Sequence, residues 1–184
     1  LFLIFFCAVV KAVDEYQDML RISVASAGND HRLGGSEAPP AIISMFVGDD
    51  LAEVLKSVAD GSDYIAKARE IMTSGVDALP DFARDTTDRN RTSPFAFTGN
   101  KFEFRMPGSS LSVSGPNFIL NTAVAESLKQ FADTLKARDD FESAVDELLR
   151  ETVKKHSRII FNGNNYSDEW IEEAEKRGLL NLRS

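Results

Sequence analysis

The chain opens with ten residues, Leu1–Val10, that carry no charged side chain, and the first charge is Lys11. A helix that is apolar all the way round has to be buried on every face, so the rest of the chain must pack around it. Acidic residues follow at positions 14, 15 and 18, which makes the apolar run too short to span a bilayer. The pattern over residues 1–25 predicts one core helix, apolar in its first half and amphipathic in its second, with no membrane contact.

No initiator methionine or basic segment precedes this apolar run, which argues against a secretory signal peptide. An amino terminus inside an apolar helix is unusual for a natural protein. We therefore expect the chain to be a fragment of a longer protein.

The composition limits the class of protein. A length of 184 residues suits one domain, and a hydrophobic fraction of 43% with a charged fraction of 27% is typical of a soluble globular protein. The net charge of −8 argues against a nucleic acid partner, because phosphate contacts need a basic surface. The one cysteine, Cys7, has apolar neighbours and favours a buried side chain in a reducing compartment, so we expect a cytoplasmic protein. Neither histidine lies in a Cys/His cluster, which argues against zinc.

The remaining segments mix strand and helix patterns without a regular strand–helix–strand rhythm. This order favours an α+β fold, with helices packed on part of an antiparallel sheet. Strands are expected over 41–47 and 158–161, and a hairpin over 94–106 with its turn at Gly99-Asn100. Helices are expected over 50–60, 117–137, 140–156 and 168–177, capped by Asp50, Gly61, Ser167 and Gly178. Residues 61–93 are irregular, with a turn or two of helix expected within 64–72.

Ser26–Pro40 predicts a loop built to approach a ligand. It places an arginine and a glutamate among small residues and ends in two prolines. Its glycines permit close approach of the main chain, and the prolines stiffen its end. A charged segment held between rigid supports is how many enzymes cover an anionic substrate. The alternative is a surface loop whose charges are only solvated.

The strand expected after Gly99 alternates strictly, with three apolar side chains on one face and Lys101, Glu103 and Arg105 on the other. Upstream, the run 84–93 holds three arginines and predicts either a solvated loop or a display of arginines for phosphate. Arginine forks suit carboxylate and phosphate oxygens, and glutamates suit Mg²⁺. The chain has no glycine-rich nucleotide loop and no defensible catalytic triad. The charged set therefore fits phosphoryl transfer to an anionic acceptor, with a purely structural role as the alternative.

Three stretches resemble glutamine synthetases of the long type III class. Ser26–Ser44 resembles the glutamate-binding loop and flap of that family. Asp88–Arg105 resembles its arginine segment and its Glu-x-Arg strand, and Ile159–Trp170 resembles the type III tail. The resemblance covers essentially the whole chain. It implies that residues 1–184 are a single partial domain, the C-terminal part of the catalytic domain, without the upstream part or the amino-terminal domain.

The resemblance also implies an activity. The family joins ammonia to the γ-carboxylate of glutamate with ATP, through γ-glutamyl phosphate, and uses Mg²⁺ or Mn²⁺. The expected partners are glutamate, ammonia and ATP, and the full-length parent is expected to be a cytoplasmic homo-oligomer of stacked hexameric rings. The isolated chain should be inactive, because one metal site needs carboxylates that lie upstream.

Two roles near the loop follow from the resemblance. Arg32 resembles the arginine that holds the glutamate substrate, and Gly28 and Asn29 are its expected substrate-binding neighbours. Glu37 resembles the flap glutamate, which helps to take the proton from ammonium and shields the acyl phosphate from water. Arg32 and Glu37 stand one residue closer than in the shorter classes, so the loop should be tighter.

The second set of roles concerns phosphate and metal. Arg91 resembles an arginine that steadies the ATP phosphates. Glu103 resembles the metal-binding glutamate of Glu-x-Arg, and Arg105 resembles its partner, which contacts the transferring phosphate or the substrate. The shorter classes carry a second arginine after Asn-Arg-Ser, where this chain has Phe95–Phe97. We expect Lys101 to take its place.

Three other functions stay open on these residues. A γ-glutamyl-amine ligase or a guanidino kinase would use a similar charged set. A non-catalytic homologue could bind glutamate or a regulatory partner through the same loops.

Overall fold

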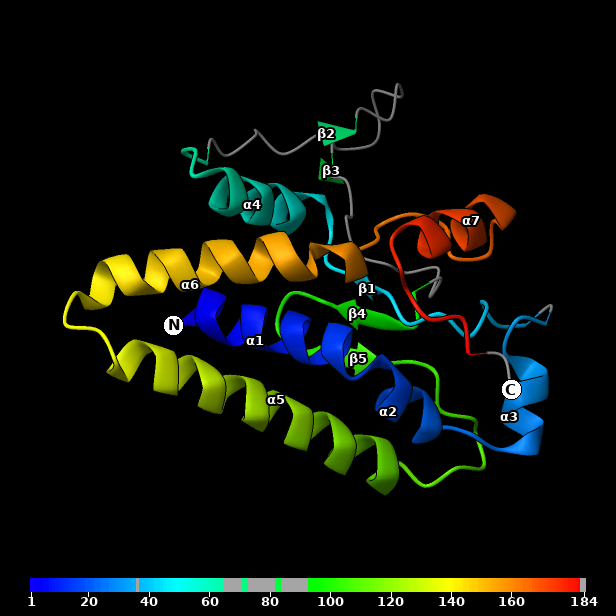
Figure 1. Ribbon diagram of the computed structural model, residues 1–184. Helices are drawn as coiled ribbons and strands as arrows, with labels where there is room; N and C mark the ends of the chain where they lie inside the picture. The colour runs from blue at the N-terminus through cyan, green and yellow to red at the C-terminus, as the bar shows by residue number, and fades with distance from the viewer. Residues whose placement is uncertain (36, 65–70, 73–81, 84–92, 183–184) are drawn as a thin grey trace.

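A computed structural model describes residues 1–35, 37–64, 71–72, 82–83 and 93–182, and every structural statement below concerns these residues. Figure 1 shows α1 lying between α5 and α6, with a small sheet beside it. The helices are α1 (Phe2–Glu15), α2 (Gln17–Ile22), α3 (Ala27–Arg32), α4 (Asp49–Asp60), α5 (Ser114–Lys136), α6 (Phe141–His156), η1 (Ser157–Ile159) and α7 (Asp168–Lys176). The strands are β1 (Met45–Phe46), β2 (Ile71–Met72), β3 (Phe82–Ala83), β4 (Phe95–Phe97) and β5 (Phe102–Phe104). The α+β class is confirmed.

The apolar amino-terminal segment forms the centre of the core, but not as one helix. Phe6 and Val13 are fully buried in α1, as predicted. The expected helix over 1–25 is wrong in one respect, because it breaks at Tyr16 into α1 and α2. Burial on all faces is also wrong for the first turn. Phe2 and Phe5 are 53% and 46% exposed there, although the ring of Phe2 contacts that of Phe97.

The hairpin forms where the alternation placed it. β4 and β5 pair antiparallel, with Phe95 opposite Phe104, and Gly99 takes a positive φ of 90° at the turn. β1 joins β4 in parallel, so the three-stranded sheet is mixed rather than wholly antiparallel. The strand expected over 41–47 is correspondingly short, because only Met45 and Phe46 pair with β4.

Several smaller expectations were corrected. α4 begins after Gly48, which offers no side-chain cap, rather than at the expected Asp50. The expected strand over 158–161 is mainly η1, followed by a single bridge from Ile160 to Met45. Ile71–Met72 pairs with β3 and is not helical, and residues 65–70 lie outside the described residues. Gly61 and Gly178 do follow their helices with positive φ, and the Ser167 side chain caps α7.

A polar cluster is buried where α1 meets α6. Asp14 on α1 and His156 on α6 are 4% and 2% exposed, and Asp14 Oδ2 lies 2.7 Å from His156 Nδ1. The other carboxylate oxygen accepts from Arg158 Nε at 2.9 Å and from Gln17 Nε2 at 3.2 Å. Every oxygen of this buried carboxylate is therefore engaged, which ties the first helix to the C-terminal half of the chain.

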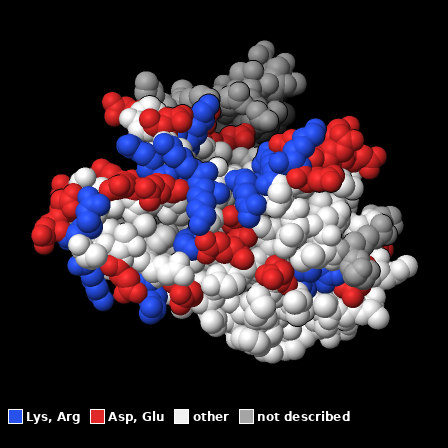
Figure 2. Space-filling view, viewed as in Figure 1, with Lys and Arg blue, Asp and Glu red and all other residues white. Residues whose placement is uncertain are grey.

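The surface is divided by charge. Figure 2 shows Lys, Arg, Asp and Glu gathered over the side that carries α4 and α6, while few charged side chains cover α2 and the first part of α5. Met19, Ile22 and Phe118 are exposed on those last two helices. Cys7 is buried, as expected, and its burial raises its pKa to about 12. Among the described helices, none is both long enough and apolar enough to cross a membrane.

Candidate active site

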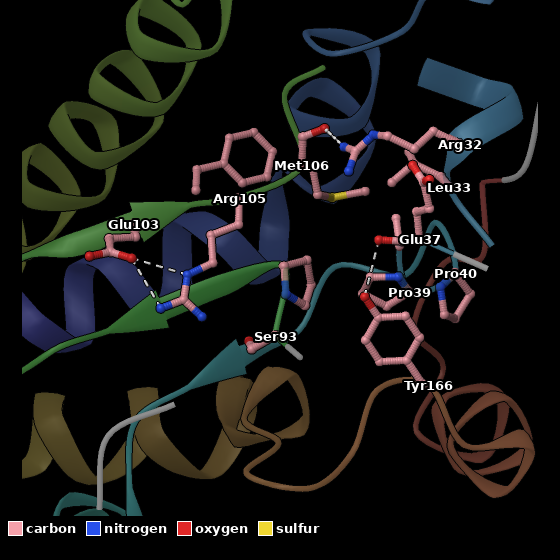
Figure 3. Close-up of a pocket in the computed structure, with 13 residues that line it drawn as sticks. Arg32, Leu33, Glu37, Pro39, Pro40, Ser93, Glu103, Arg105, Met106 and Tyr166 are labelled. Carbon is pink, nitrogen blue, oxygen red and sulfur yellow. Dashed lines mark hydrogen bonds and ion pairs between the residues drawn. The ribbon is translucent and has the colours of Figure 1, made fainter. Parts of the chain in front are cut away.

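A cavity of about 560 Å³ opens between the end of α3, Leu33, residues 37–40, strand β5 and Tyr166 (Figure 3). Four residues singled out from the sequence line it together: Arg32, Glu37, Glu103 and Arg105. They come from segments about 70 residues apart in sequence, and the packing of α3 against the end of β5 brings them to one place.

Arg32 is the last residue of α3. The expected loop over Ser26–Pro40 therefore starts as a helix, because the Ser26 side chain accepts from Asn29 N and caps it. Arg32 Nε donates to Asn29 Oδ1 at 2.9 Å, and its Nη2 donates to the Met106 carbonyl at 2.7 Å. These two bonds fix the direction of the guanidinium at the pocket wall.

Gly28 and Asn29 do not line the pocket, although both were expected to bind substrate. Asn29 is 4% exposed, and its Nδ2 donates to the carbonyls of Val24 and Met106. A buried amide with these partners orients Arg32 rather than facing the cavity. Gly28 is an exposed residue of α3, and a Cβ there would meet open space.

The chain on either side of Glu37 is joined at its base. Leu33 and Ala38 form an isolated bridge, and Gly34 N donates to the Pro39 carbonyl at 2.9 Å. Gly34 takes a φ of 77°, a conformation that suits glycine. Glu37 is exposed beyond this base, and its main-chain carbonyl accepts a 3.3 Å hydrogen bond from Tyr166 Oη.

Glu103 on β5 and Arg105 directly after it lie on one face, as their alternation predicted, and form an ion pair. Arg105 Nε and Nη2 lie 3.1 and 3.0 Å from Glu103 Oε2, and Lys101 Nζ lies 3.2 Å from Oε1. The hydrogen bond from Arg105, followed by that from Lys101, lowers the pKa of Glu103 below its ordinary value. Lys101 itself lies outside the pocket lining, with its side chain 63% exposed near the hairpin turn.

This pairing gives a pH-dependent prediction. Arg105→Met should raise the pKa of Glu103 toward its ordinary value, and Lys101→Met should raise it less, because water screens the exposed ammonium. The folded pKa of Glu103 lies below the unfolded value of about 4.3, so its contribution to stability is present above that pH. That contribution is lost as the pH falls through the folded pKa. A ¹³C NMR titration of the Glu103 carboxyl measures the shift, and an identical curve in Arg105→Met would contradict the pairing.

The structure describes only some of the residues that were expected to bind metal or nucleotide. Arg91 lies outside the described residues. Within the described part of the chain, no group of three or more His, Cys, Asp or Glu side chains is arranged to hold a metal ion. Glu37 and Glu103 supply carboxylate oxygens, the donors that Mg²⁺ prefers, so the pocket fits part of a cation's ligand set.

Sequence reasoning missed Tyr166 and Ser93, which also line the pocket. Tyr166 lies inside the tail segment 159–170 and Ser93 inside the segment 88–105, both of which were recognised as family-like. The family-like segments could have pointed to these two residues, but nothing in them indicated which side chains face the cavity.

Comparison with known proteins gives concordant matches. Residues 144–184 match a family model described as the glutamine synthetase C-terminal domain. A glutamine synthetase from Butyrivibrio fibrisolvens is 52% identical over 100% of this chain and 26% of its own length. A type-3 glutamine synthetase from Dictyostelium discoideum is 46% identical over 100% of this chain and 25% of its own length. A glutamine synthetase from Bacteroides fragilis (strain YCH46) is 42% identical over 99% of this chain and 26% of its own length.

Over essentially its whole length, the chain is similar to part of these glutamine synthetases, at 42–52% identity. The resemblance to glutamine synthetases, including the type III class, is therefore confirmed. The chain spans about a quarter of the length of the curated relatives it matches. The single partial domain over 1–184 stays a prediction.

Proposed function

We propose that this chain supplies part of the active site of an enzyme that joins ammonia to the γ-carboxylate of L-glutamate at the expense of ATP. The observation that supports it best is the shared pocket of Arg32, Glu37, Glu103 and Arg105. It places two guanidinium groups and two carboxylates around one cavity, as a reaction between an anionic substrate, a phosphoryl group and a cationic nucleophile requires. A cytoplasmic location and a ring-shaped homo-oligomer belong to the same proposal.

Arg32 binds the glutamate substrate in this proposal. Two of its nitrogens are held by Asn29 and by the Met106 carbonyl, so little side-chain freedom is lost when a carboxylate binds. The side chain is half-buried at the pocket wall, where its charge is less screened than at an open surface.

Glu37 takes the proton from ammonium and shields the acyl phosphate from water. An exposed carboxylate at the rim of the pocket attracts the incoming cation and can then accept its proton. The Leu33–Ala38 bridge and the hydrogen bond from Gly34 N to the Pro39 carbonyl hold the chain that carries Glu37 close to the cavity.

Arg105 and Glu103 act on the phosphoryl group. Arg105 is 16% exposed and presents a fixed guanidinium, which suits the oxygens of a transferring phosphate. A bound Mg²⁺ would neutralise phosphate charge, and Glu103 would provide one of its oxygen ligands. Because its pKa is lowered, Glu103 is negatively charged at neutral pH and can bind a cation. Arg91 and Lys101 remain the proposed contacts for the ATP phosphates.

The test is formation of γ-glutamyl hydroxamate from glutamate, hydroxylamine and Mg-ATP. The full-length protein that contains this chain should form it, and the purified chain alone should not, because its pocket offers only part of the ligand set for a cation. Hydroxamate from the isolated chain would contradict the proposed division of the site. Phosphate release that depends on a larger amine, with ammonia inert, would favour a γ-glutamyl-amine ligase instead. Binding of Mg-ATP without turnover would favour a non-catalytic homologue.

A further inference from the structure

Tyr166 reaches the pocket from the C-terminal part of the chain. It lines the cavity, and its hydroxyl donates to the main-chain carbonyl of Glu37, 129 residues away in sequence (Figure 3). The tyrosine is 44% exposed, so burial of its ring does not explain its position. Its hydroxyl contacts the residue proposed to accept the proton from ammonium.

The segment Asn162–Tyr166 that carries this tyrosine is firmly held. Asn165 is 1% exposed, and its Nδ2 donates to Ser44 Oγ at 2.6 Å. Asn162 Oδ1 accepts from two main-chain amides, those of Val47 and Gly48, at 3.0 and 3.2 Å. These contacts fix the segment against the chain that follows Glu37, so Tyr166 has a rigid base.

An aromatic pair supports the same segment, and one of its members, Phe161, directly precedes Asn162. The rings of Phe161 and Trp170 stack with their centroids 3.8 Å apart, and the Arg177 guanidinium lies 5.7 and 5.6 Å from the two centroids. Trp170 is 1% exposed. The support for Tyr166 is therefore part of the packed structure and includes α7.

Glu37 has less support of its own. The bridge between Leu33 and Ala38 joins the chain on either side of it, while Glu37 itself is exposed. A hydrogen bond to its carbonyl limits how the main chain at this residue can move. The main chain at Glu37 sets the position of the Cα–Cβ bond from which the side chain extends.

We propose that Tyr166 is a positioning residue, which holds Glu37 over the pocket through the hydrogen bond to its carbonyl. This inference rests on the proposed function for its catalytic consequence, but not for its structural one. Loss of the hydroxyl frees the main chain at Glu37. The acyl phosphate is then less well shielded, and water competes with ammonia. Water attacks the γ-carbonyl carbon, the bond to the phosphate oxygen breaks, and glutamate and phosphate are released without glutamine.

The first test needs no activity. Tyr166→Phe keeps the ring and removes only the hydroxyl. In the full-length protein, amide hydrogen exchange in the peptide covering residues 33–38 should become about threefold to tenfold faster, the change expected for one hydrogen bond. Tyr64→Phe is the matched control, since Tyr64 is 41% exposed and does not line the pocket, and it should leave that peptide unchanged. Unchanged exchange in Tyr166→Phe would overturn the proposal.

The second test measures coupling of ATP use to amide formation. In Tyr166→Phe, phosphate released per glutamine formed should rise by about threefold or more, with the half-saturating glutamate concentration little changed. In a Glu37→Ala background, Tyr166→Phe should add nothing, because the residue that it positions is gone. Additive effects would show that Tyr166 does not act through Glu37, and would overturn the proposal.

The two tests separate this inference from the proposed function. Faster exchange in Tyr166→Phe, with no glutamine or hydroxamate formed by the wild-type protein, would refute the proposed function and leave the positioning role standing. If the wild-type protein is fully active and Tyr166→Phe leaves exchange and coupling unchanged, the positioning role is refuted and the proposed function stands.

Discussion

Glu37→Gln in the full-length protein is expected to lower the rate of glutamine formation by about 10²- to 10⁴-fold, the usual contribution of a general base. Glutamine has the same shape as glutamate but cannot accept a proton or attract a cation. Because Glu37 is exposed, the free energy of unfolding should change by less than about 0.5 kcal/mol. Steady-state rates with ammonium, together with urea titration, measure the two effects.

The choice of nucleophile sharpens this prediction. Ammonia is protonated at neutral pH and must lose a proton, whereas hydroxylamine is largely uncharged there. The loss of rate in Glu37→Gln should therefore be much smaller with hydroxylamine than with ammonium. Glu172→Gln, an exposed glutamate on α7, is the control and should retain full activity. Equal losses with both nucleophiles would argue that Glu37 has no role in proton transfer.

Asp14→Ala is expected to give the largest loss of stability, about 3 kcal/mol, because it removes one partner from a buried charged cluster. His156, 2% exposed, would lose its 2.7 Å partner and keep Glu15 Oε1 at 3.7 Å, and Gln17 would lose a second acceptor. Arg158 is 42% exposed and can turn to water, which places the expected cost at the low end for such clusters. The free energy of unfolding from urea titration measures it.

A surface ion pair provides the comparison. Lys129 and Asp133 are 69% and 60% exposed on α5, with 3.2 Å between their charged atoms. Asp133→Ala should cost less than about 1 kcal/mol, since water already solvates both charges. A cost for Asp14→Ala no larger than that for Asp133→Ala would show that the buried cluster does not stabilise the fold.

Local sequence patterns were enough to predict the elements that depend on interactions between residues close in sequence. The strict alternation around Glu103 gave the hairpin and the shared face of Glu103 and Arg105. Gly61 and Ser167 marked helix ends because a positive φ and a side-chain acceptor act within one turn. The family resemblance added which charged residues to consider together, and the pocket contains four of them.

Other features depend on individual side-chain contacts, near or distant in sequence, which the apolar pattern does not reveal. α1 and α2 separate at Tyr16, where the Gln17 side chain donates to the Asp14 carbonyl. Phe141 is apolar but 59% exposed, and it stands in the first turn of α6. The buried setting of Asn29 arises from Val24 and Met106, 5 and 77 residues away.

The stacked pair of Phe161 and Trp170 has a practical consequence. Trp170 is the chain's single tryptophan, and its indole is shut away from solvent. Ultraviolet emission excited selectively from this indole therefore comes from the one region where α7 meets the segment leading to Tyr166. The protein carries an intrinsic optical reporter at the support of its pocket, with no dye or label attached.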